Sequence, residues 1–437
     1  MKKSVIALLL LAVLIIIVSP GIIGKLAEDS VSENLNWAAD ESGELVVSSD
    51  GFDRGWFSSE GQHRVTIGDG SIRAAMSSAD GGMNEVPVLL INTHIDHGLI
   101  PLSSMRREEG SLAPGLGNAV STLAIEMVDG ESVDLPGTIY SELGLGGDLS
   151  SRYVVDAGSH TAKDGAVTWE PTTIHVAASA KAGDISYEGD VGRMTFAGDL
   201  EVVSIDGLTF AGSQTNTPYG FYVGDFEVNI GAMSIDSGGM PGGGMGGMTV
   251  KGSSSVDDGL VAAAMHLEMD GSAIPDFGAI SVIADMDFDG VDAVALGAVS
   301  QRLDDLSGSQ DPSMFMVTAE AELKDLLAAG INIGIDQLDV ALPMGTVTSR
   351  MSFEVPESDR ATFEWTSLLL GLVGEVYISV PEALVQLATS VDPQAGALIG
   401  MGYLRKEGDA YVMDAKMKKG LLTVNGAPIP IPMGAFQ

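Results

Sequence analysis

The sequence predicts a mainly β protein of the α+β class, with elongated, curved antiparallel sheets, a few short helices and an N-terminal transmembrane helix. Three observations predict this architecture. Long stretches alternate apolar and polar side chains, which is typical of antiparallel strands with one buried and one wet face. Glycine provides 56 of the 437 residues, as many turns and bulges require. One uncharged apolar stretch, at the N-terminus, is long enough to cross a bilayer.

Composition excludes several classes of protein. The chain has 60 acidic and 22 basic side chains and a net charge of −38, which would repel nucleic acid. It has no cysteine, so disulfide scaffolds, thiolate metal sites, iron–sulfur clusters and cysteine nucleophiles are excluded. The apolar fraction of 45% is enough for a packed core rather than a disordered chain.

The N-terminus predicts export. Two lysines precede the uncharged residues 4–24, and mostly acidic residues follow them. We therefore expect residues 1–24 to be a signal anchor with a cytoplasmic N-terminus, and residues 25–437 to form an exported body. A cleaved signal peptide is the alternative, because the apolar run Val5–Val18 has a suitable length, although Pro20 interrupts the cleavage site.

Within the body, residues 25–43 predict a helix that leads out of the membrane, and the period then changes to that of strands. The clearest alternation lies in residues 225–230, 265–270 and 284–289. These segments predict strands of an antiparallel sheet.

Helices are expected in few places. Thr318–Ala329 has leucines on one side and Gly330 as a C-cap, and Pro381–Thr389 begins with proline and an early glutamate. A shorter helix near Ser104–Glu109 has weaker support.

The Gly/Met-rich segment 237–248 predicts a loop between strands. An alternative is a flexible apolar contact patch made by its methionines. No boundary divides the body, so we expect one elongated β-rich unit.

Two segments resemble metal or catalytic sites but fit them poorly. The Asp285–Gly290 segment begins like a calcium loop, yet Leu296 stands where the last carboxylate ligand is needed, so we interpret the aspartates as the wet face of a strand. His94 and His97 are three residues apart on a predicted strand and point to opposite faces. His94 and Asp96 share a face, which by itself is usually a structural pair.

No nucleophile elbow, phosphate-binding loop, zinc-protease motif or dinucleotide fingerprint is present. We therefore assign no catalytic, cofactor-binding or metal residues, and we expect neither a cofactor nor an enzyme.

Several motifs together resemble one family. They are the N-terminal anchor, residues 52–59 (FDRGWFSS), residues 97–101 (HGLIP), residues 338–345 (LDVALPMG) and Tyr411 with residues 420–426 (GLLTVNG). On these motifs the chain resembles the YdgA-like family of Gram-negative bacteria, exported proteins of unknown function. The resemblance implies an inner-membrane anchor and a periplasmic body, but no mechanism.

The shared residues have structural interpretations. We expect a bulge or close backbone approach at Gly55, Trp56 and Phe57 at the edge of a core, and a tight turn at Asn425-Gly426.

Three functions follow as hypotheses. The first is a non-catalytic envelope protein that scaffolds or binds another envelope component. The second is a lipid-binding or lipid-transfer protein with an apolar sheet groove, AsmA-like by analogy. A hydrolase with a carboxylate pair is a remote third. A scaffold predicts a closed core, whereas a lipid-binding protein predicts an apolar face that no second layer covers.

Overall fold

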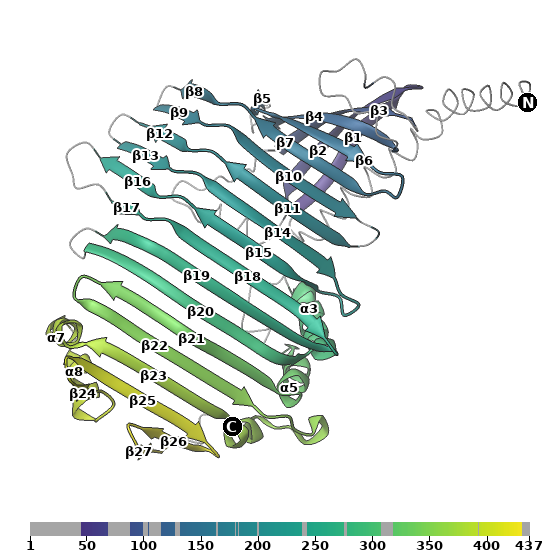
Figure 1. Cartoon of the computed structure of the whole chain (residues 1–437). Helices are drawn as coiled ribbons and strands as arrows, with labels where there is room; N and C mark the ends of the chain where they lie inside the picture. The colour runs from purple at the N-terminus through teal and green to yellow at the C-terminus, as the bar shows by residue number, and fades with distance from the viewer. Residues whose placement is uncertain are drawn as a thin grey trace, which may run out of the picture. The chain divides into compact units, whose positions relative to one another are not determined.

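The computed structural model describes residues 45–68, 88–98, 104, 115–126, 132–162, 165–179, 181, 183–198, 201–237, 243–274, 278–306, 318–391 and 393–430. Strands dominate these residues, and every strand pairing recorded in register is antiparallel (Figure 1). The mainly β, antiparallel prediction is therefore confirmed. The chain divides into two compact units.

Unit 1 comprises residues 1–158 and 170–191. Its strands pair in the order β1–β2–β3–β4–β6–β7–β10–β11, with β5 also against β4. Their bounds are β1 Leu45–Arg54, β2 Ser58–Ile67, β3 Val88–His97, β4 Gly117–Glu126, β5 Ser132–Asp134, β6 Thr138–Leu143, β7 Leu149–Val155, β10 Thr172–Ser179 and β11 Asp184–Val191. In the first halves of β2 and β4 every second residue is buried, which fixes the register because a slip by one residue would exchange the faces.

Unit 2 comprises residues 159–169 and 192–437. Its main run of paired strands is β14–β15–β18–β19–β20–β21–β22–β23–β25–β26–β27. Their bounds are β14 Leu208–Asn216, β15 Tyr222–Ile230, β18 Met248–Asp257, β19 Leu260–Ile274, β20 Gly278–Asp292, β21 Ile331–Leu342, β22 Gly345–Val355, β23 Val373–Pro381, β25 Ala410–Lys418, β26 Leu421–Val424 and β27 Ala427–Ile429. The short β24, Arg405–Glu407, pairs with β25.

A second run, β9–β12–β13–β16–β17–β19, joins the first at the long strand β19. The strands of this run are β9 Gly165–Trp169, β12 Met194–Ala197, β13 Glu201–Ile205, β16 Met233–Ser237 and β17 Gly244–Met245. Strand β8, Gly158–Ala162, precedes β9 in the chain.

Breaks between consecutive strands of unit 2 lie next to each other in the sheet and are joined by backbone hydrogen bonds. Gly207, between β13 and β14, accepts a hydrogen bond of 2.8 Å from the N–H of Gly231, between β15 and β16. Gly247, between β17 and β18, accepts one of 2.8 Å from Asp270, where the register of β19 shifts. Aligned glycines and bulges of this kind increase local twist and bend a sheet.

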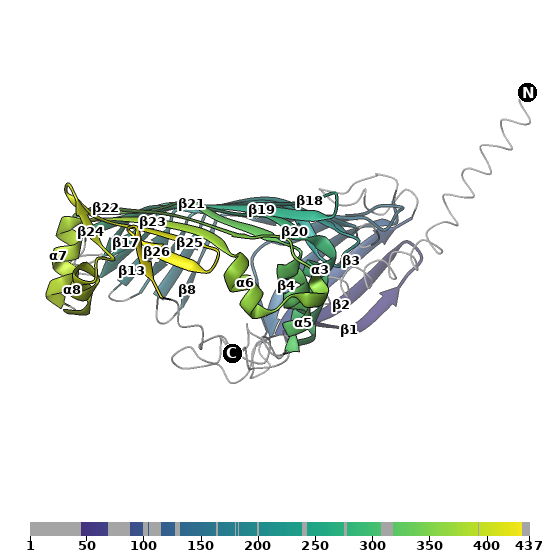
Figure 2. The same ribbon diagram turned by 90° about the horizontal axis from the view of Figure 1, so that it is seen from below.

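The helices of unit 2 lie at the two ends of its strands. Their bounds are α3 Ala293–Leu306, α5 Glu320–Ala328, the 3-10 turn η2 Arg360–Thr362, α6 Trp365–Gly371, α7 Glu382–Val391 and α8 Pro393–Gly400. Helices α3, α5 and α6 adjoin one end, and α7 and α8 adjoin the other (Figures 1 and 2). A buried cluster around Val261, Val291 and Ala293 lies at the first end, where Leu296 of α3 and Leu326 of α5 pack on the sheet.

The structure confirms the helices predicted over 318–329 and 381–389, which are α5 and α7. Gly330 follows α5 with φ of 93°, a conformation that glycine adopts without strain. Sequence analysis missed α3. The residue that could have indicated its start is Asp292, whose Oδ1 accepts a hydrogen bond of 2.8 Å from the N–H of Ala295, as an N-cap residue does. Sequence analysis also missed α6 and α8.

Other predictions lie partly or wholly outside the described residues. These are the anchor at 1–24, the helix at 25–43 and most of the helix near Ser104–Glu109. No helix among the described residues is long and apolar enough to cross a membrane. The predicted loop over 237–248 is shorter than expected, because Gly244–Met245 pairs with β16 and β19, and Met248 begins β18.

The turns predicted from the family motifs can be compared directly. Gly55 makes the expected close approach, since its N–H donates to Ser58 O at 2.8 Å. Trp56 and Phe57, however, are exposed in the turn between β1 and β2 and do not cover a core. Asn425-Gly426 forms the predicted tight turn, with φ of 50° and 80°.

Candidate functional site

One face of the unit 2 sheet carries apolar side chains in continuous rows across the strands. Residues directly opposite each other in an antiparallel pair share a face, so the register defines each row. The first row is Leu208, Ile230, Met248, Met269, Val282, Val340 and Val347. The second row is Phe210, Val228, Val250, Leu267, Ala284 and Leu338. The third row is Gly212, Phe226, Gly252, Met265, Met286, Ile335, Met351 and Val376. We call these three rows the apolar face.

The apolar face remains accessible to solvent. Of its residues only Ala284 is buried, and Met265 keeps 38% of its surface exposed. Side chains between two packed sheets would be close to fully buried. Within the described part of unit 2, packing onto this side comes from the helices at the strand ends, and Figure 2 shows one layer of strands between them.

Methionine and glycine shape the apolar face. Met248 lies directly opposite Met269, and Met265 lies directly opposite Met286. Gly252 allows the ring of Phe226 to lie across its strand, since a Cβ there would come within 2.1 Å of the ring. Unbranched, polarizable methionine side chains adapt to irregular apolar ligands. The apolar face is therefore lined in part by side chains that can adapt to a ligand.

The opposite face of the same strands is polar and acidic. Glu227, Lys251, His266, Asp285 and Gln337 form one row, with an ion pair of 3.3 Å between Lys251 and Glu227 and a contact of 2.6 Å between His266 Nδ1 and Asp285 Oδ1. An open hollow of about 450 Å³ lies over this row.

The three aspartates of the calcium-like segment lie on strand β20, as predicted. Asp285 contacts His266, and Asp289 accepts a hydrogen bond of 2.8 Å from Asn332. Burial raises the pKa of Asp287, and the charges of Asp336 and Asp289 raise it further. Among the described residues, no three His, Asp or Glu side chains gather as a metal ion would require.

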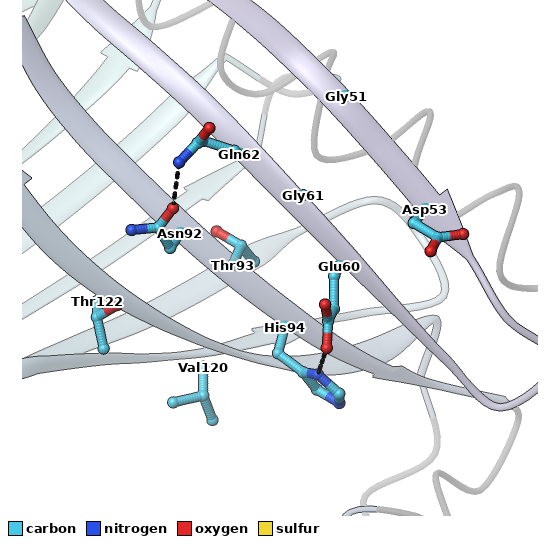
Figure 3. Close-up of a pocket in the computed structure, with 10 residues that line it drawn as sticks. All are labelled: Gly51, Asp53, Glu60, Gly61, Gln62, Asn92, Thr93, His94, Val120 and Thr122. Carbon is cyan, nitrogen blue, oxygen red and sulfur yellow. Dashed lines mark hydrogen bonds and ion pairs between the residues drawn. The ribbon is translucent and has the colours of Figure 1, made fainter.

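Unit 1 carries a second polar hollow, of about 820 Å³, over β1–β4 (Figure 3). Gln62 donates to Asn92 at 2.7 Å on one side of it. His94 lies between two carboxylates, with Nδ1 3.5 Å from Glu60 and Nε2 3.4 Å from Asp96. Both ring nitrogens of His94 therefore face carboxylates, and the hollow presents several hydrogen-bonding side chains.

The other face of these strands forms a buried core with polar members. His97 lies there, 3.0 Å from Ser59, so the prediction that His94 and His97 point to opposite faces is confirmed. His63 is also buried, with Nδ1 2.8 Å from Ser49 Oγ. Burial lowers the pKa of His63. These histidines support packing within unit 1.

Of these features, the apolar face differs most from a sheet whose apolar side is buried in a core. Large exposed apolar surfaces mark sites that bind other molecules. Sequence analysis predicted its alternating strands but not the rows that they form together. The small number of predicted helices could have indicated this face, because few helices were available to cover one side of the predicted sheet.

Comparison with protein families places the chain. A family model described as "Bacterial protein of unknown function (DUF945)" matches residues 1–432, and the chain belongs to this family. No curated protein and no solved structure matches it.

Proposed function

We propose that this chain is a non-catalytic, membrane-anchored protein of the bacterial envelope that binds the acyl chains of lipids on the apolar face of unit 2. Residues 4–24 would hold it in the inner membrane, with the body in the periplasm. The narrower YdgA-like assignment belongs to this proposal and agrees with a bacterial family that spans nearly the whole chain.

The observation that carries the proposal is the exposure of the apolar face. A scaffold with a closed core would bury these rows, whereas Met265 and Phe226 keep more than a third of their surface accessible. Acyl chains need no hydrogen bonds from the protein, so rows of side chains without polar atoms suit them. Adaptable methionines further suit chains that lack a fixed shape.

The direct test is lipid analysis of the full chain extracted in mild detergent. Mass spectrometry of the organic extract is expected to detect acyl lipids bound to the wild type. Met265→Gln places an amide in the apolar face and is expected to reduce the bound lipid several-fold, because burying an unpaired amide opposes binding.

A matched control lies one residue away. Ala264→Gln introduces the same side chain on the exposed opposite face of β19 and is expected to leave bound lipid unchanged. Equal lipid content in Met265→Gln and the wild type, or no bound lipid in either, would contradict the proposal.

A further inference from the structure

Helices α7 and α8 form a hairpin that exposes apolar side chains at the end of unit 2. Val391 keeps 78% and Met401, just after α8, 58% of its surface exposed, and Leu387 and Leu398 are exposed as well. Leu387 and Val391 are four residues apart and Leu398 and Met401 three, so each pair lies along one side of the chain's helical path. Val385, by contrast, is buried. The hairpin therefore has a packed side, at Val385, and an outer side that exposes Leu387, Val391, Leu398 and Met401.

The hairpin carries few charged residues, although the chain as a whole is strongly acidic. Between Glu382 and Arg405, Asp392 is the one charged residue in the sequence. Glu382 is engaged with Lys406 at 2.5 Å. A net charge of −38 repels a second copy of the chain and any acidic surface. This repulsion is weakest at segments of the chain with few carboxylates.

The hairpin adjoins the apolar face. Helix α7 follows β23 directly and contacts both β23 and β25. Figure 2 shows α7 and α8 at the end of the strands opposite α3 and α5, on the same side of the sheet. The hairpin therefore adjoins β23, the strand that carries Val376 of the apolar face.

We propose that the outer side of the α7–α8 hairpin inserts into the surface of a lipid bilayer and is where lipid enters or leaves the apolar face. This inference rests on the proposed function, which supplies the lipid ligand. Helices that lie at a membrane surface bury their apolar side about 5–10 Å into the boundary between headgroups and acyl chains. The exposed leucine, valine and methionine side chains of the hairpin can supply such a side.

The absence of cysteine allows a direct test on the full chain. Val391→Cys and, as a control, Ala264→Cys on the polar face each create one thiol for an environment-sensitive fluorophore. The labelled proteins are reconstituted into phosphatidylcholine vesicles with and without nitroxide-labelled lipid. We expect nitroxide lipid to quench the label at position 391 at least twofold more than the label at position 264.

Other outcomes overturn the inference. Equal quenching at both positions places the hairpin outside the bilayer. A blue-shifted label at position 391 without quenching indicates that a second copy or another protein covers it.

Failure of this inference can be separated from failure of the proposed function. Lipid that co-purifies with the wild type and is lost in Met265→Gln, without quenching at position 391, contradicts only the role of the hairpin. Quenching at position 391 with no bound lipid contradicts the lipid-binding function and with it the entry route.

Discussion

His63 is 98% buried in unit 1, with its Nδ1 hydrogen-bonded to Ser49 and its Nε2 without a hydrogen-bond partner in the described structure. A buried imidazole is stable there only in its neutral form, and burial therefore lowers its pKa. In the unfolded chain the same ring takes up a proton as the pH falls through 6.5, its ordinary value. The unfolded state then binds more protons than the native state.

It follows that acid should destabilise unit 1 through His63. Stability is expected to fall as the pH is lowered from about 7.5 to about 5.5, and to fall less in His63→Gln, which has no ionisable ring. Urea unfolding at both pH values measures this difference. His94→Gln serves as the control, because His94 lies outside the core between two carboxylates. An unchanged pH dependence in His63→Gln would contradict this account of the core.

At the scale of elements, Asp292 joins strand β20 to helix α3. Its carboxylate accepts the N–H of Ala295 and pairs with Arg360 at 2.7 Å. Burial acts to raise the pKa of Asp292, but these hydrogen bonds outweigh burial and lower it. Asp292, just beyond the calcium-like segment, is thus a helix cap.

Removing this cap should loosen α3. Asp292→Ala is expected to destabilise the helix by about 1–2 kcal/mol, the usual value of an N-cap. Asp292→Asn keeps an acceptor oxygen and should lose less. Hydrogen exchange of peptides from 293–306 reports the change. Equal protection in Asp292→Ala and the wild type would show that packing alone holds α3.

Strands and their faces could be predicted from the sequence wherever alternation was strict. Residues 225–230, 265–270 and 284–289 all lie on strands that carry apolar and polar side chains on opposite faces, but the apolar face is accessible and not buried as expected. Their assembly into rows depends on which strands pair and at what register, and bulges at Asp270 and Asp336 shift that register in ways that local sequence does not specify. The prediction that Trp56 and Phe57 lie at the edge of a core was wrong because residues 52–59 span a turn between two strands and not one strand.

At the scale of the whole molecule, we propose that a strongly acidic body is attached to a membrane. A net charge of −38 keeps the polar surfaces hydrated and dispersed, so attachment to a bilayer has to come from apolar segments. We assign this role to residues 4–24 and, secondarily, to the α7–α8 hairpin.

These two segments should differ in how strongly they bind the membrane. A chain that lacks residues 1–24 and is exported by another signal sequence is expected to move from the membrane fraction to the soluble fraction of the periplasm, because a spanning helix binds far more strongly than a surface helix. Fractionation and immunoblotting measure the distribution. Recovery of the shortened chain entirely in the membrane would contradict the tether.

Photo-crosslinking with a diazirine-bearing fatty acid tests the central claim most directly. The full chain is irradiated with the probe in bacterial membranes, and the modified residues are mapped by mass spectrometry. The account predicts adducts on Val250, Leu267 and Met286, which share the apolar face. Adducts that are equally frequent on their neighbours across the sheet, Thr249, His266 and Asp285, would contradict it.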